Sequence, residues 1–87
     1  MLICMNRVLL NNLIDSLLRI EDRDAMKDFL RGVLTPGELD EIPQRLEIVR
    51  LLKEGVAQHE IARRLGVGVA TVTRGSKELQ KGRFQNV

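Results

Sequence analysis

Few side chains in this 87-residue sequence are of the kinds that carry out chemistry. His59 is the only histidine and Cys4, to which we assign no role, is the only cysteine, so one chain can form neither a disulfide nor a Cys/His cluster that would hold a structural zinc. We find no nucleophile beside a base, no paired carboxylates that suggest a pocket and no glycine-rich phosphate loop. The sequence therefore predicts a protein that is not an enzyme, with no catalytic residue, metal or cofactor.

The most informative spacing lies in residues 58–75, which read QHEIARRLGVGVATVTRG. The small Ala62 lets two helices cross closely, Gly66 turns the chain with a positive φ, and the branched Val72 wedges between the helices. The side chains that then face outward are Ala70, Thr71 and Thr73. This arrangement is that of a helix-turn-helix, which we place at about residues 57–79.

Positive charge gathers in the same part of the chain. Residues 1–54 carry eight Lys or Arg and ten Asp or Glu, whereas residues 55–87 carry six and two. A basic final third favours contact with a polyanion. The only aromatic residues are Phe29 and Phe84, too few for modules that stack single-stranded bases on aromatic side chains, so the expected partner is double-stranded DNA.

Helices must position these residues, because apolar side chains recur at helical spacing and strand patterns are missing. The sequence predicts helices over about residues 8–20 and 25–33, and a third that starts at Pro36 and stops at Gly55. Pro43 either kinks this third helix or divides it in two. Residues 81–87 lack periodicity and are expected to fray. The predicted fold class is all-α, with one domain over residues 1–87.

The wide apolar stripes of the first two helical stretches suggest that two chains associate. A chain of this size buries little surface alone, so we expect a homodimer. No apolar run is long enough to span a bilayer, and the apolar opening at residues 1–5 has no preceding basic segment that would make it a signal peptide. We therefore expect a cytoplasmic protein with no membrane partner.

From Leu34 to Leu79 the sequence resembles the Trp operon repressor family. The resemblance rests on Leu34-Thr35-Pro36, on Arg45 and on the run from Gly66 to Ser76. The segment from Gln44 to Arg50 also resembles a group of shorter Trp-repressor-like regulators. The resemblance implies an intertwined homodimer that binds an operator as a transcriptional repressor.

The resemblance also implies a site for L-tryptophan as a possible corepressor. In Trp repressors the indole lies between two arginines, which match Arg45 and Arg74, and a planar guanidinium suits an aromatic face. Arg74 would bind the ligand carboxylate with help from the Thr35 hydroxyl, and Gly75 would give the indole room.

The ligand ammonium group would be met by backbone carbonyls near Gly32 and Leu34 of the partner subunit. Glu78 stands where the family has a serine near this ammonium group. Its carboxylate could pair with the ammonium group or repel the ligand carboxylate.

Seven residues match DNA contacts of the family. Three face bases, two lie near phosphates at a helix N-terminus, and two contact the DNA backbone at the start of the preceding helix. The residues that face bases are Val69, Ala70 and Thr73. Those near phosphates are Gly68 and Thr71, and those that contact the DNA backbone are Gln58 and His59.

Three functional hypotheses follow. The first is a sequence-specific, homodimeric repressor with L-tryptophan as corepressor. The second is a Trp-repressor-like regulator that needs no amino-acid corepressor or uses another small-molecule effector, which Glu78 and the short Gly55–Gly66 span favour. The third is a helix-turn-helix for protein interaction or for DNA binding in a replication or transposition protein, against which the basic surface argues.

Overall fold

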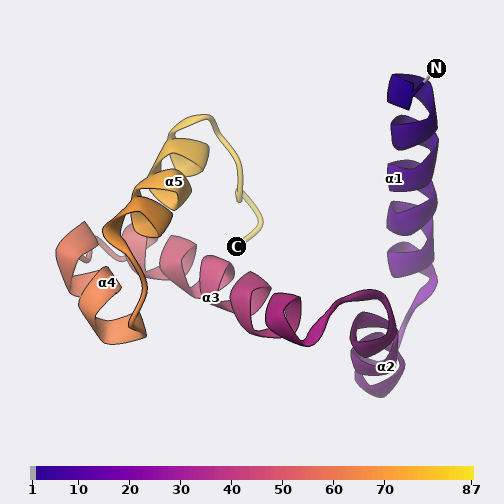
Figure 1. Ribbon diagram of the computed structural model, residues 1–87, viewed down its shortest axis with the longest axis horizontal. Helices are drawn as coiled ribbons and strands as arrows, with labels where there is room; N and C mark the ends of the chain where they lie inside the picture. The colour runs from indigo at the N-terminus through magenta and orange to yellow at the C-terminus, as the bar shows by residue number, and fades with distance from the viewer. Residues whose placement is uncertain (1) are drawn as a thin grey trace. The chain divides into compact units, whose positions relative to one another are not determined.

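The computed structural model describes the backbone of residues 2–87 and the side chains from Met5 onward, so Cys4 lies outside the described side chains. Over this range the chain forms five α-helices and no strand (Figure 1), which confirms the all-α prediction. The helices are α1 (Leu2–Arg19), α2 (Arg23–Val33), α3 (Pro36–Lys53), α4 (Gln58–Leu65) and α5 (Val69–Gln80). Within the described residues, no helix is both long and apolar enough to cross a membrane.

The chain divides into two compact units, and the boundary along the sequence falls between Pro36 and Gly37. The prediction of a single domain over residues 1–87 stays a prediction. The predicted helix-turn-helix lies wholly in the second unit.

The first unit contains α1 and α2 but buries none of its described side chains. The Asp22 carboxylate caps α2 by accepting a hydrogen bond from the Ala25 amide at 2.7 Å, and the Leu34 amide ends the helix by donating to the Leu30 carbonyl at 2.9 Å. The large apolar side chains that stay exposed in this unit are Met5, Val8, Leu9, Leu10, Leu13, Ile14, Leu18 and Val33. The unit therefore has apolar faces without a core of its own to cover them.

The helix α3 runs through Pro43 without a break. The division at Pro43 that the sequence left open is therefore not found. Proline in a helix removes one backbone donor, the one that would reach the Leu39 carbonyl, and an 18-residue helix tolerates this single loss. Pro36 takes the first helical position, as predicted.

The second unit has an apolar core between α3, α4 and α5. Its buried members come from all three helices, and Val72 of α5 is fully buried among them, which confirms its predicted wedge position. The clustered core residues are Ile48, Leu51, Ile61, Ala62 and Val72, with Leu52, Val56, Leu65 and Val67 packed against them. Figure 1 shows α4 and α5, in orange, next to each other at the C-terminal part of α3.

The turn between α4 and α5 depends on Gly66. Its φ of 65° is left-handed, as the sequence predicted. The Gly66 amide donates to the Ala62 carbonyl, and the left-handed conformation of Gly66 turns the amide of Val67 back to the same carbonyl at 3.1 Å. The two bonds end α4 and start the chain toward α5.

The tail after α5 lies outside any helix but forms turns that return toward α3. Gly82, with φ of 90°, donates to the Leu79 carbonyl at 3.1 Å, and Arg83 donates to the Glu78 carbonyl at 3.2 Å. This pair of bonds is a Schellman motif, which reverses the chain at a helix end. Sequence analysis expects residues 81–87 to fray, whereas the structure gives them hydrogen-bonded turns.

Candidate functional site

The outward face of α5 carries most of the residues that the resemblance matches to DNA contacts. Ala70 and Thr71 are exposed and Val69 is 39% exposed, so all three lie open at the helix N-terminus. Gly68 precedes the helix with an extended backbone. A depression along this face is lined by Val69, Ala70, Thr73, Arg74, Lys77, Glu78 and Lys81. Three of these seven side chains are basic and one is acidic, so the face is net positive.

Thr73 differs from its neighbours because it is half-buried and bonded to α4. Its hydroxyl donates to Oε1 of Gln58 at 2.9 Å. The outward position expected for Thr73 is therefore only partly realised. This bond links the first turn of α4 to α5, and it joins two residues that the sequence assigned separately to base and backbone contacts.

The remaining residue of that set, His59, is exposed in the first turn of α4. Next to it, Glu60 accepts hydrogen bonds from Arg63 and, at 3.0 Å, from Nε of Arg64. These bonds, that from Arg63 first, lower the pKa of Glu60 to about 2. Both guanidinium groups of α4 are thus already paired within the helix.

A second cavity, of about 200 Å³, lies behind α5. Residues from α3, from α5 and from the tail line it: Arg45, Ile48, Val49, Thr71, Arg74, Gly75, Glu78 and Phe84. The structure therefore brings Arg45 and Arg74 together with Gly75 and Glu78, four of the residues that the resemblance assigned to a ligand.

Gly75 lies at a close approach of α5 to α3. A Cβ atom at this position would lie 3.1 Å from Cγ2 of Ile48 and 3.7 Å from Cδ1 of Leu52. Such a distance to Ile48 is shorter than ordinary van der Waals contact, so the glycine makes room for a buried α3 side chain as well as lining the cavity. The resemblance implies that a glycine here gives the indole room, and the structure shows that it also gives room to α3.

Glu78 lines the cavity and is paired with two basic residues of the tail. Its carboxylate lies 3.5 Å from Nζ of Lys81 and 3.4 Å from Nε of Arg83. Its negative charge is therefore partly neutralised from outside the helix, which weakens its repulsion of an anionic ligand.

The other residues assigned to the ligand belong to the first unit. Gly32 lies in α2, Leu34 ends that helix, and Thr35 directly precedes α3. Their ligand role stays a prediction.

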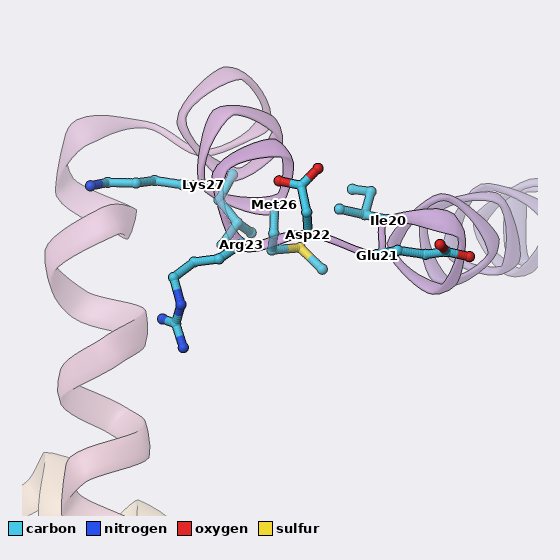
Figure 2. A pocket seen from close by; sticks show the side chains of 7 residues that line it. Ile20, Glu21, Asp22, Arg23, Met26 and Lys27 are labelled. Carbon is cyan, nitrogen blue, oxygen red and sulfur yellow. The ribbon is translucent and has the colours of Figure 1, made fainter.

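The first unit has an open groove of its own, where α1 gives way to α2. Its apolar part comes from Ile20, Met26 and Leu30. Figure 2 shows the Arg23 and Lys27 side chains extending away from Met26, at the edge of the groove. None of the residues assigned to DNA or ligand lines it.

Sequence reasoning missed three residues that line the cavity, which are Ile48, Val49 and, from the tail, Phe84. The tail lacks periodicity, which gave no reason to place its side chains anywhere. The available signal was Gly82, because a glycine just after a helix end is typical of a turn that sends the chain back across the helix.

Comparison with known proteins places the chain in a family. The family model described as "Trp repressor protein" matches residues 9–86. The chain belongs to the Trp repressor family. No solved structure gives a significant match.

Three relatives show the range of the similarity. The "Trp operon repressor homolog" of Vibrio vulnificus (strain YJ016) is 49% identical over 52 residues, which cover 59% of this chain and 51% of the relative. That of Actinobacillus succinogenes is 39% identical over 71 residues, covering 80% and 70%. The "Uncharacterized protein YerC" of Bacillus subtilis (strain 168) is 33% identical over 73 residues, covering 84% and 70%. The matched part of this chain thus spans about half the length of the Vibrio relative.

Proposed function

We propose that this chain is a DNA-binding transcriptional repressor that works as a homodimer and uses L-tryptophan as its corepressor. Membership of the Trp repressor family supports DNA binding and regulation. The names of the Vibrio and Actinobacillus relatives support a link to the trp operon.

The observation that carries the proposal is that α5 contributes to two surfaces at once. Its outward face presents Val69 and Ala70, whereas Thr71, Arg74 and Gly75 also line the cavity behind it. A ligand in the cavity would touch the same helix that meets the DNA. It would favour repression by binding more tightly to the helix orientation that fits the major groove.

The proposed DNA contacts divide by chemistry. Val69, Ala70 and Thr73 would meet base edges, while Gly68 and Thr71 at the start of α5 would meet phosphates. At the start of α4, Gln58 and His59 would contact the backbone, which positions the protein without reading sequence.

The proposed ligand contacts rest on the two arginines of the cavity. Guanidinium groups at Arg45 and Arg74 suit both the faces of an indole and a carboxylate. Thr35, and the backbone near Gly32 and Leu34 of the partner subunit, would complete the site in a dimer.

The homodimer is supported by the first unit. Exposed apolar side chains along α1 and at the end of α2 lack a core within that unit. Many exposed apolar side chains on one helix favour an interaction site, and a two-fold pair of recognition helices is what half-sites one helical turn apart require.

A second candidate function is a regulator of the same family that needs no amino-acid corepressor or takes another effector. Glu78 favours it, because this carboxylate lines the cavity in which a ligand carboxylate would lie. The name of the Bacillus relative makes no claim about tryptophan.

Thermal unfolding with and without millimolar L-tryptophan distinguishes the two candidates. A ligand at 100 times its Kd stabilises the native state by about 2.7 kcal/mol. For a domain of this size, such a gain corresponds to a rise in Tm of roughly 10 °C or more. We expect this rise with L-tryptophan and not with D-tryptophan or L-phenylalanine.

The informative variants are Arg45→Ala and Arg50→Ala. Both residues are exposed arginines of α3, but Arg50 lies outside the cavity and pairs with Glu47 and Glu54. Arg45→Ala should abolish the tryptophan-dependent rise and Arg50→Ala should keep it. If L-tryptophan does not raise the Tm of the wild-type protein, it is not the corepressor, and the second candidate function is favoured.

A further inference from the structure

The tail places an aromatic ring beside the two arginines of the cavity. Phe84 is the only aromatic residue of the second unit, and it lines the same cavity as Arg45 and Arg74. The residue is 36% exposed, so it is partly covered although it lies in the tail.

Several contacts hold the tail in this position. The Schellman motif at Gly82 reverses the chain, and the Arg83 guanidinium lies 3.4 Å from the Glu78 carboxylate. The Lys53 ammonium group donates to the carbonyl of Phe84 and, at 2.9 Å, to that of Val87. The tail is thus attached both to the end of α5 and to the end of α3.

The backbone of Phe84 supports the same conclusion. Its φ of 64° makes it the only non-glycine residue with positive φ among those described. This conformation is unfavourable for a residue with a Cβ atom. Such a residue keeps the conformation where surrounding contacts require it. The hydrogen bond from Lys53 to the Phe84 carbonyl is one such contact.

The ring forms a wall of the cavity and does not fill it. With Phe84 in place, about 200 Å³ remain open. Sites for drug-sized ligands have about 300–1,000 Å³, so this space suits a smaller molecule. An aromatic face and two guanidinium groups around one space favour a planar aromatic ligand, through ring packing and cation–π attraction.

We propose that Phe84 is a ligand-contact residue, supplied by the chain's own tail, that makes the cavity selective for planar aromatic ligands of amino-acid size. This inference rests on the proposed effector function of the cavity. It adds a specificity determinant that lies outside α3 and α5.

Calorimetric titration with L-tryptophan, and with L-leucine as a non-aromatic probe, tests the inference in the full chain. Phe84→Ala removes the ring, Phe84→Leu keeps apolar bulk without an aromatic face, and Asn86→Ala, at an exposed residue, is a control in the same tail. Phe84→Ala should raise the Kd for L-tryptophan about three- to tenfold, the range given by aromatic pair energies. Phe84→Leu should lower the preference for tryptophan over leucine, and Asn86→Ala should bind like the wild type.

Two results would overturn the inference while leaving the effector function in place. An unchanged Kd in Phe84→Ala would show that the ring makes no ligand contact. A lower Kd would show that the ring competes with the ligand. If neither the wild type nor any variant binds an aromatic amino acid, the effector function itself fails, and the ligand role of Phe84 fails with it.

Fluorine NMR tests the position of the ring without any ligand. Because the chain has only two phenylalanines, labelling with 4-fluorophenylalanine gives two signals, and Phe29 of the first unit serves as an internal reference. The solvent isotope shift of the Phe84 signal should be smaller in the folded protein than in the protein unfolded in urea. The chemical shift of this signal should also change in Arg45→Ala. A Phe84 signal that is identical in water and in urea would overturn the inference whatever the titrations show.

Discussion

Replacing Gly66 with alanine tests the turn on which the orientation of α5 depends. A Cβ atom at Gly66 would meet nothing within 4 Å, so Gly66→Ala introduces no steric clash. The cost is the left-handed backbone at φ of 65°, which disfavours an L-residue by roughly 1–2 kcal/mol. Alanine also reduces the conformational entropy of the unfolded chain, which offsets about 0.4–1 kcal/mol of this cost.

The expected net loss of stability in Gly66→Ala is therefore about 1 kcal/mol, or roughly 4–8 °C in Tm. Gly66→Asn is the matched control, because asparagine also adds a side chain but tolerates the left-handed region. Its loss should be less than half as large. Circular dichroism at 222 nm during urea and thermal unfolding measures both variants. Equal losses in the two variants would refute the assignment of the cost to backbone conformation.

Three further variants test the core, the contact between α5 and α3, and the charges of α4. Val72→Ala removes two methyl groups from a fully buried side chain and should cost about 2–3 kcal/mol in urea unfolding; a loss below 1 kcal/mol would contradict the wedge position. Gly75→Ala gains about 1 kcal/mol of helix propensity but must displace Ile48, at about 1–3 kcal/mol, so we expect a lower Tm and would be contradicted by a higher one. Because bonding from Arg63 lowers the folded-state pKa of Glu60 to about 2, the stability that this carboxylate contributes is present above its ordinary pKa of 4.5 and is lost as the pH falls from there toward 2. The difference in Tm between wild type and Glu60→Gln should shrink across that range, and a constant difference would argue against the bonded carboxylate.

The sequence predicted the parts of the fold that depend on local chemistry. The turn after α4 needs a residue with positive φ, which glycine adopts more readily than other residue types. The structure has this conformation at Gly66. The helical spacing placed Val72 between α4 and α5, where it is buried. Pro36 and Gly55 marked the ends of the third helix for reasons of backbone bonding, and these ends were also confirmed.

Other features depend on packing that a local pattern does not encode. Whether Pro43 divides α3 depends on the bonds and contacts of the whole helix, and the structure keeps one helix. The sequence pattern placed the start of the first helix near Val8, but α1 begins at Leu2, because the polar Asn6 and Arg7 interrupt the apolar residues without ending the helix.

The candidate site was only partly predictable. The grouping of Arg45 with Arg74 followed from a family resemblance, because no spacing rule links residues on two different helices. The position of Phe84 was missed because it depends on the reversed tail and on Lys53, which is distant in the sequence. The bond between Thr73 and Gln58 was also beyond a residue-by-residue interpretation, since each had been assigned to DNA alone.

In the proposed function, the cavity behind α5 controls DNA binding by that helix. The most direct test is to select duplexes from a random double-stranded pool in the presence of L-tryptophan, and then to measure the Kd for the enriched duplex with and without the ligand. Arg45→Ala is the informative variant, since Arg74 lines both surfaces and Arg45 lines only the cavity. We predict a Kd that falls at least fivefold with L-tryptophan, a size typical of allosteric coupling, in the wild type and in Arg50→Ala but not in Arg45→Ala. If the wild-type protein binds the enriched duplex with the same Kd with and without L-tryptophan, the cavity does not control DNA binding in this way.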